Sequence, residues 1–221
     1  MESRGDSFLW CIYRGMIPAY FINLDKDTDR LQHIQGVLSD IFLPEHIHRI
    51  SGVVHKEGKH GCRLAHIRAH VQAISHGHPY YLICEDDLTP LVGDSKEILQ
   101  YIQDSISSKP SLVLFEQAEG IESTVRMHQS EVHPQLYRIL GGGQGTGCYL
   151  CSRKFGIKLI ELWTRVTKRH IDYSWQQLWE SNDVYFHRPQ LFIQRAGNSN
   201  QNDVGWRASQ RPFDWEYTPS K

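Results

Sequence analysis

Short apolar runs that end in polar turns alternate with segments of helical periodicity along this chain. Apolar runs of about four to eight residues are typical of buried strands, and apolar residues at every third or fourth position predict amphipathic helices. Strands are predicted at 19–24, 46–54, 80–84, 111–115, 136–140, 146–151 and 191–194, and helices at 25–41, 62–75, 95–107, 154–166 and 172–180. This alternation predicts an α/β fold with a mostly parallel sheet flanked by helices on both faces.

The helix at 62–75 has two stripes with different chemistry. Leu64, Ile67, Val71 and Ile74 recur at helical spacing and predict the buried face. His66 and His70 lie on a neighbouring stripe; their spacing lacks the glutamate of a zincin motif, so His70 is interpreted as a packed or hydrogen-bonded helix residue. The segment 117–134 has no clear period and is predicted to be a long loop.

Size and charge narrow the class of protein. The 221 residues are predicted to form a single domain, 1–221, with a core at about 19–203 and a polar C-terminal tail. A net charge of −1 without any run of Lys and Arg argues against a nucleic-acid partner. No apolar stretch approaches the ~18 residues of a membrane span, and the polar N-terminus does not resemble a signal peptide. A cytoplasmic location is therefore expected.

The five cysteines support a reducing compartment. Their number is odd and their spacing matches no disulfide framework, so free thiols are expected. Cys148 and Cys151 form a C-x-x-C pattern, but the pair lies inside a predicted strand without a second pair elsewhere. We interpret both as small buried residues, and Cys62 as a core residue.

Polar residues follow two of the predicted strands at the point where each strand ends. Asn23 and Asp25 follow the first strand, and Glu85-Asp86-Asp87 follow the strand at 80–84. Ligands of open α/β sheets bind at the carboxyl ends of strands, so these side chains are expected at one edge. Three consecutive carboxylates suit a solvated turn, or a hard cation such as Mn²⁺ or Mg²⁺ bound together with substrate phosphates.

Several segments resemble motifs of glycosyltransferase family 25, which includes lipooligosaccharide glycosyltransferases and collagen hydroxylysine galactosyltransferases. They are INLDKDTDR at 22–30, GCRLAH at 61–66, LICEDDL at 82–88, GTGCYLCSR at 145–153, ID at 171–172 and PQLFIQ at 189–194. They occur in the family's order and span roughly residues 19–203. Two features depart from the pattern: Ala65 replaces the usual serine, and an Asn-rich stretch at 198–203 stands where the family often has Ser-Asp.

The resemblance implies a GT-A-like, Rossmann-type nucleotide-sugar-binding domain, a UDP-sugar donor, inversion at the anomeric carbon and a bound Mn²⁺ or Mg²⁺. A hexose, galactose or glucose, would pass to a hydroxyl of a glycan or of hydroxylysine in a collagen-like protein. The implied donor-binding residues are Asn23, Leu24, Arg30, His66 and Glu85; the implied metal ligands are Asp87 and Glu85. Catalytic roles fall to Asp172, as the base, and to Asp86. Glu85 and Asp87 are expected to face the donor, with Asp86 on the other side of the strand end.

The glycine-rich stretch at 141–147 lies between two predicted strands rather than before a helix, so it suits a sugar-site loop better than a phosphate-binding loop. Gln144 and Thr146 are its candidate acceptor-binding residues.

Purely structural roles are the alternative for several of these residues. Asn23 could cap the following turn, Arg30 could lie on a solvated helix face, and Asp172 could be a helix N-cap. Glu116 and Asp203 are the next candidates for the base. At the level of the whole protein, a nucleotide-sugar- or carbohydrate-binding module without turnover and a metal-dependent hydrolase are the alternatives to a transferase.

Overall fold

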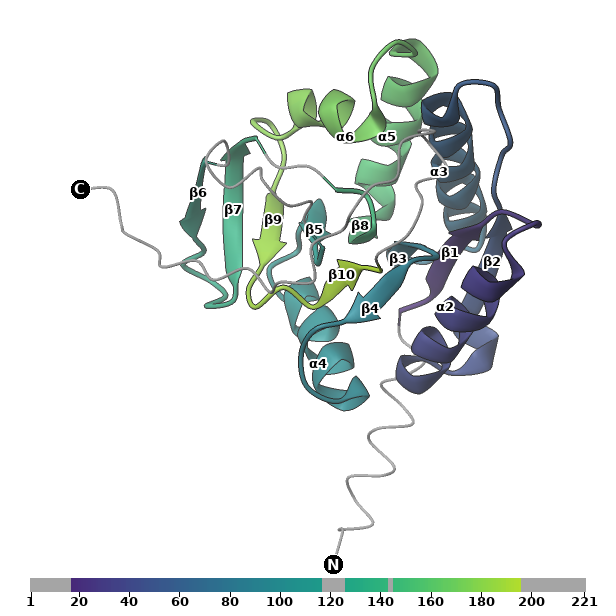
Figure 1. Cartoon of the computed structure of the whole chain (residues 1–221). Coiled ribbons are helices and arrows are strands. Elements are labelled where there is room, and N and C mark those ends of the chain that lie inside the picture. Colours follow the sequence, from purple (N-terminus) through teal and green to yellow (C-terminus); the bar gives the residue numbers. More distant parts are fainter. Residues whose placement is uncertain (1–16, 117–125, 143–144, 196–221) are drawn as a thin grey trace, which may run out of the picture.

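The computed structural model describes residues 17–116, 126–142 and 145–195 and centres on an eight-stranded sheet in the order β2-β1-β3-β8-β5-β9-β7-β6 (Figure 1). The strands of this sheet are β1 (Ala19–Asn23), β2 (Ile47–Ser51), β3 (Tyr80–Glu85), β5 (Leu112–Leu114), β6 (Arg126–Gln129), β7 (Leu136–Gly141), β8 (Cys148–Ser152) and β9 (Val184–His187). The helices are α2 (Thr28–Ile41), α3 (Gly58–Ser75), α4 (Ser95–Ile106), α5 (Arg153–Arg165) and α6 (Ile171–Ser174), with short 3-10 turns at Pro44–His46 and Trp175–Leu178. A separate pair joins β4 (Leu88–Pro90) to β10 (Phe192–Gln194).

The predicted α/β class with a mostly parallel sheet is confirmed. β1 pairs in parallel with both β2 and β3, and β5 pairs in parallel with β9. β8 lies antiparallel between β3 and β5, and β7 lies antiparallel to β9 and to β6. All strands of the large sheet except β7 and β8 therefore run in the same direction.

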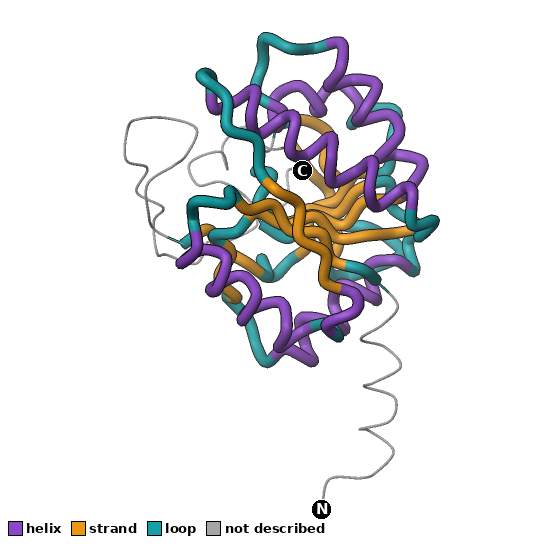
Figure 2. Tube along the Cα trace, turned by 90° about the vertical axis from the view of Figure 1, so that its right-hand side faces the viewer, coloured by secondary structure: helices purple, strands orange, loops and turns teal. Residues whose placement is uncertain are grey.

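Helices cover both faces of the sheet (Figure 2). Successive residues of a strand point to opposite faces, so β3 places Leu82 and Cys84 in one hydrophobic cluster and Tyr81 and Ile83 in another. α2 and α4 close the first cluster, and α3, α5 and α6 close the second. Within the described ranges, no helix is long and apolar enough to cross a membrane.

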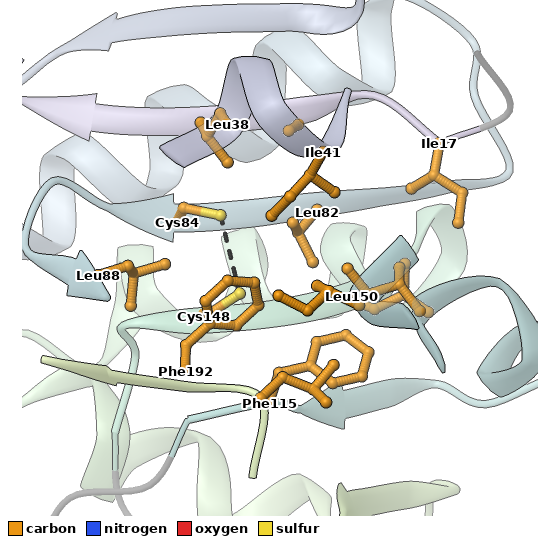
Figure 3. Packing of buried hydrophobic residues seen from close by; sticks show 14 of the residues in the cluster. Ile17, Leu38, Ile41, Leu82, Cys84, Leu88, Phe115, Cys148, Leu150 and Phe192 are labelled. Atoms are coloured by element: carbon orange, nitrogen blue, oxygen red, sulfur yellow. Dashed lines mark hydrogen bonds between the residues drawn. The ribbon is translucent and has the colours of Figure 1, made fainter. Parts of the chain in front are cut away.

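Figure 3 shows part of the first cluster, in which Leu38 and Ile41 of α2 pack over the strands. The sulfur atoms of Cys84 and Cys148 lie 3.8 Å apart there. None of the described cysteines, Cys62, Cys84, Cys148 and Cys151, forms a disulfide bond. Cys148 and Cys151 are buried, as the pattern predicts; Cys62, expected in the core, is only half-buried.

The buried face of α3 is the main error of the sequence prediction. The helix begins at Gly58, one turn before the predicted start, and Leu64 and Val71 are 43% and 52% exposed. Ile67 and Ile74 are half-buried and pack against the second cluster, as predicted, but the fully buried residues are Gly61, Arg63, Ala65, His66, Ala69, His70 and Ala73. Small side chains let α3 approach the sheet and α5 closely, and the two histidines become buried because tyrosine hydroxyls satisfy them.

Three short strands were not predicted. β4 and β6 have three and four residues, too few to show a period, and β6 lies in the segment predicted to be a loop. β9 has four residues next to a cis Arg188-Pro189 bond. Such strands are defined by their partners rather than by their own sequence.

Gly61 is the position where α3 comes closest to the preceding loop. A Cβ there would lie 2.2 Å from the carbonyl oxygen of Val53. We expect Gly61→Ala to lower the free energy of unfolding by on the order of 2 kcal/mol, because backbone must shift to relieve the clash. Gly36→Ala is the matched control: nothing lies within 4 Å of its Cβ, so the substitution should stabilise α2 by about 0.5–1 kcal/mol. Urea unfolding measures both; equal effects would contradict the close approach.

His187 is expected to make the protein less stable in mild acid. The side chain is 0% exposed, its Nδ1–H donates to the oxygen of Pro189 at 2.8 Å, and its Nε2 has no partner among the described residues. Burial lowers the pKa of His187 from 6.5 to about 4. Between pH 6.5 and pH 4, His187 is protonated in the unfolded chain but not in the folded protein. The folded state is therefore most stable, with respect to this residue, above pH 6.5, and it loses stability as the pH falls towards 4. The loss amounts to about 3 kcal/mol.

His187→Gln should reduce the stability difference between pH 7.5 and pH 4.5 by about 2–3 kcal/mol, measured by urea unfolding. The comparison between variant and wild type isolates this residue from the other histidines. An unchanged pH dependence would show that His187 does not titrate on unfolding.

Candidate functional site

Asn23, at the end of β1, is a fixed part of the sheet edge. Its side-chain nitrogen donates to Asp86 Oδ2 at 2.7 Å and to the oxygen of Asp27 at 3.1 Å. Its side-chain oxygen accepts from Arg49 at 2.8 and 3.2 Å. Arg49 also pairs with Asp25 at 2.6 Å. The predicted meeting of Asn23 with the acidic triplet at one sheet edge is therefore confirmed, and the Asn23 side chain bonds the turn before α2.

Arg30 of α2 supplies a positive charge to the acidic triplet. Its Nη2 lies 2.7 Å from Asp86 Oδ1 and 2.5 Å from Asp87 Oδ2. Asp86 is thus beside Asp87, and the expectation that it lies on the other side of the strand end is wrong. Both oxygens of Asp86 are engaged, one by Arg30 and one by Asn23. Burial raises the pKa of Asp86, and Arg30 acts against that rise.

One carboxylate oxygen of Asp87 is not used in the hydrogen bonding of the described residues. Its Oδ1 is buried and has no hydrogen-bond partner in the described part of the chain. Burial, followed by the negative charge of Glu85, raises the pKa of Asp87 to about 7. A carboxylate in this state is one that a cation would stabilise.

Glu85, the last residue of β3, is held by Thr146 and His66 rather than by Arg30. Its Oε1 accepts a hydrogen bond from Thr146 at 2.6 Å and lies 3.3 Å from His66 Nε2. Burial acts to raise the pKa of Glu85, but the hydrogen bonds from His66 and Thr146 together lower it. Glu85 is therefore the member of the triplet whose pKa is lowered rather than raised.

Two further carboxyl groups face this cluster. Glu116 lies two residues after the end of β5 and accepts a hydrogen bond from the backbone N–H of Gly147 at 3.2 Å. Burial, and then the charges of Glu85 and Asp87, raise its pKa to about 8. Asp172, in the first turn of α6, has a pKa raised by burial and by Glu85, and a buried Oδ1 without a partner among the described residues. The N-cap of α6 is His170, so the N-cap interpretation of Asp172 is wrong.

A buried chain of histidines and tyrosines runs away from Glu85 under α3. His66 Nδ1 lies 2.8 Å from the hydroxyl of Tyr149, which lies 3.1 Å from His70 Nε2. His70 Nδ1 lies 2.7 Å from the hydroxyl of Tyr81. None of the four residues is more than 1% exposed. The interpretation of His70 as a hydrogen-bonded helix residue is confirmed.

The remaining predicted residues are placed as follows. Leu24 follows β1 and packs against Gly52, where a Cβ would lie 2.7 Å from Leu24 Cδ2. Thr146 is buried and directed at Glu85, an arrangement that its prediction as an acceptor contact did not include. Gln144 and Asp203 lie outside the described residues.

Sequence reasoning ranked Glu116 only as a reserve and gave Tyr149 no role. Glu116 could have been predicted as a site residue, because it follows an apolar run directly, as Glu85 does at the end of β3. Tyr149 gave no such signal, since a tyrosine within a buried strand normally indicates packing.

Two buried carboxylate oxygens at this edge are available to a divalent cation, although the group of three possible metal ligands whose atoms lie within 4.8 Å of one another in the described ranges is Cys62, His66 and Glu85. Asp87 and Asp172 each have a buried oxygen without a partner among the described residues, and Asp86, Asp87, Glu116 and Asp172 all have raised pKa values. Hard oxygen donors of this kind are the ligands that Mg²⁺ and Mn²⁺ prefer. Burial is the largest cause of all four raised pKa values, and a bound cation would stabilise the buried charged forms.

No protein-family profile and no curated protein matches the chain. Among solved structures, a UDP-glucose pyrophosphorylase from Acinetobacter baumanii is similar, with a TM-score of 0.52 and 11% identity over 85% of this chain and 75% of that one. A mannose-1-phosphate geranyltransferase from Thermus thermophilus matches with a TM-score of 0.47 and 9% identity, over 77% of this chain and 73% of that one. At such identities the first likeness shows the fold alone, and the second is too weak to add to it. The chain therefore shares the α/β fold of the pyrophosphorylase, a large mostly parallel sheet flanked by helices.

Proposed function

We propose that this protein is a metal-dependent inverting glycosyltransferase of the family 25 type. It would transfer a hexose, galactose or glucose, from a UDP-sugar to a hydroxyl of a glycan or of hydroxylysine in a collagen-like protein. The observation that carries the proposal is that Glu85 and Glu116 both bond to the backbone of Gly147 at the end of the strands, with Asp87 next to Glu85 and Asp172 within electrostatic reach of Glu85 and Glu116. Nucleotide-activated substrates bind at this edge in α/β folds of this kind.

The carboxylates divide into two groups in this proposal. Asp87 and Glu85 would hold Mn²⁺ or Mg²⁺, whose chemistry is to neutralise the charge of the departing diphosphate. Asn23, Leu24, Arg30 and His66 would lie on the donor side of the site. Asp86 would act through Arg30 and Asn23, because both of its oxygens already bond to them. Thr146 would orient Glu85, and Gln144 remains a proposed acceptor contact.

Asp172 would serve as the base. The acceptor oxygen attacks the anomeric carbon, its proton passes to the Asp172 carboxylate, and the bond from that carbon to the UDP oxygen breaks with its electrons on UDP. Burial raises the pKa of Asp172, which makes its carboxylate a stronger base than that of an exposed aspartate. The unpartnered Oδ1 of Asp172 is the oxygen available for that proton.

The absence of a disulfide among the described cysteines supports a cytoplasmic or other reducing location.

The UDP-glucose pyrophosphorylase with the similar fold makes nucleotidyl transfer a second reaction to be tested. A binding module without turnover and a metal-dependent hydrolase would use the same carboxylates and are tested together with it.

Product analysis separates these functions in one experiment. The protein is incubated with Mn²⁺, a panel of UDP-sugars and a mixed panel of glycan and hydroxylysine-peptide acceptors, and products are identified by mass spectrometry. A glycosyltransferase yields UDP and an acceptor heavier by one hexose. Free hexose with UDP indicates a hydrolase, and pyrophosphate release from UTP with a sugar 1-phosphate indicates nucleotidyl transfer. Donor binding without any product would reduce the protein to a binding module.

A further inference from the structure

A second group of metal-ligating side chains lies between α3 and the end of β3. Sγ of Cys62, a ring nitrogen of His66 and a carboxylate oxygen of Glu85 all lie within 4.8 Å of one another. Cys62 and His66 are four residues apart on α3 and therefore share one helix face. His66 Nε2 is 3.3 Å from Glu85 Oε1, close to the roughly 3.4 Å that separates two nitrogen or oxygen ligands of one tetrahedral Zn²⁺.

We propose that Cys62, His66 and Glu85 bind Zn²⁺, or another thiophilic divalent cation, with one coordination position left for water. A thiolate, an imidazole and a carboxylate form a donor set of the zinc type, whereas Mg²⁺ and Mn²⁺ favour oxygen ligands alone. The two sets of ligands at this edge therefore select different cations. The metal replaces the thiol proton of Cys62, which is released to solvent.

The histidine and tyrosine chain supplies the outer shell that such a site needs. A metal on Nε2 of His66 places the ring proton on Nδ1, which then donates to the oxygen of Tyr149 at 2.8 Å. The Tyr149 hydroxyl donates to His70 Nε2 at 3.1 Å, and His70 Nδ1–H donates to the oxygen of Tyr81 at 2.7 Å. Ligating histidines are held by outer partners in this way, which fix the tautomer and the ring orientation.

Without a metal, the same four side chains remain fully hydrogen-bonded if each hydrogen bond between them runs in the opposite direction. Tyr81 then donates to His70, His70 to Tyr149, Tyr149 to His66, and His66 Nε2–H to Glu85. Burial keeps His70 uncharged, since it lowers the pKa of that residue well below its usual value. Metal binding therefore changes tautomers along the chain without leaving a ring nitrogen unsatisfied.

The site is open to an incoming ion. Cys62 is half-buried and the Glu85 side chain is 18% exposed, whereas the His66 side chain is 1% exposed. Glu85 is also a proposed donor-site and metal ligand, so zinc would weaken UDP-sugar binding by drawing Glu85 away. That consequence, unlike the zinc site itself, rests on the proposed function.

Cobalt is a suitable spectroscopic probe, because a cysteine thiolate bound to Co²⁺ gives a charge-transfer absorption band. Untagged full-length protein is titrated with Co²⁺, and Zn²⁺ is then added to displace it. We expect a thiolate–cobalt band from one ion per chain, lost on addition of Zn²⁺ and absent in Cys62→Ser. Cys148→Ala should keep the band, because that thiol is buried in the cluster on the other face of the sheet. Tyr149→Phe should bind about 10–100-fold more weakly.

A wild-type protein without the band, or a Cys62→Ser variant that retains it, would overturn the proposal. His66→Gln provides a second test if Cys62→Ser fails to fold, as judged by circular dichroism. Calorimetry with UDP-sugar in the presence of Zn²⁺ then tests the shared use of Glu85. Zinc binding with unchanged UDP-sugar affinity would keep the site and reject the competition, whatever the outcome of the transferase assay.

Discussion

Asp172→Asn is expected to lower turnover by about 10²–10⁴-fold while UDP-sugar binding stays close to that of the wild type. Asparagine preserves the size and hydrogen-bonding geometry of the side chain but cannot accept the proton of the acceptor hydroxyl. The first turn of α6 should be unaffected, because its N-cap is His170. Steady-state kinetics with the best donor and acceptor pair gives turnover, and calorimetry gives donor affinity.

Glu116→Gln is the matched comparison for Asp172→Asn. Glu116 is buried, belongs to the same group of carboxyl groups and has a pKa raised to about 8. At neutral pH this pKa leaves it mostly protonated and poorly suited to accept a proton. Glu116→Gln should therefore reduce turnover much less than Asp172→Asn. The reverse order would make Glu116 the base and leave Asp172 with a structural role.

Asp87→Asn is expected to remove most of the metal-dependent UDP-sugar binding. The substitution converts an oxygen ligand to an amide and removes the charge that a divalent cation would neutralise. Arg30 keeps its contact with Asp86, so the arrangement around the triplet should persist. Donor affinity measured by calorimetry with and without Mn²⁺ should differ strongly in the wild type and little in the variant.

Asp40→Asn serves as the control for Asp87→Asn, because Asp40 lies exposed near the end of α2. It should leave the effect of Mn²⁺ unchanged. Without metal, Asp87→Asn should be at least as stable to heat as the wild type, since burial and Glu85 disfavour the charged carboxylate. Unaltered Mn²⁺-dependent binding in Asp87→Asn would remove Asp87 from the metal site.

The sequence predicted the elements whose apolar residues are regular. β1, β3 and α5 lie within one or two residues of their predicted ranges, because β1 and β3 are continuous buried apolar runs and α5 buries residues at helical spacing. The meeting of Asn23 with the triplet was also predictable, since parallel strands end at the same edge of a sheet. The short strands β4, β6 and β9 were not, because three or four residues show no period.

The sequence by itself therefore determined the α/β class, most of the helices and strands, and the edge at which polar chemistry gathers. Only the tertiary structure decided which face of α3 is buried, and that Arg30 pairs with both Asp86 and Asp87. The reason is the distance along the chain between partners. His66 is buried because Tyr149, 83 residues away, satisfies its ring, and no local pattern of apolar and polar positions records that partner.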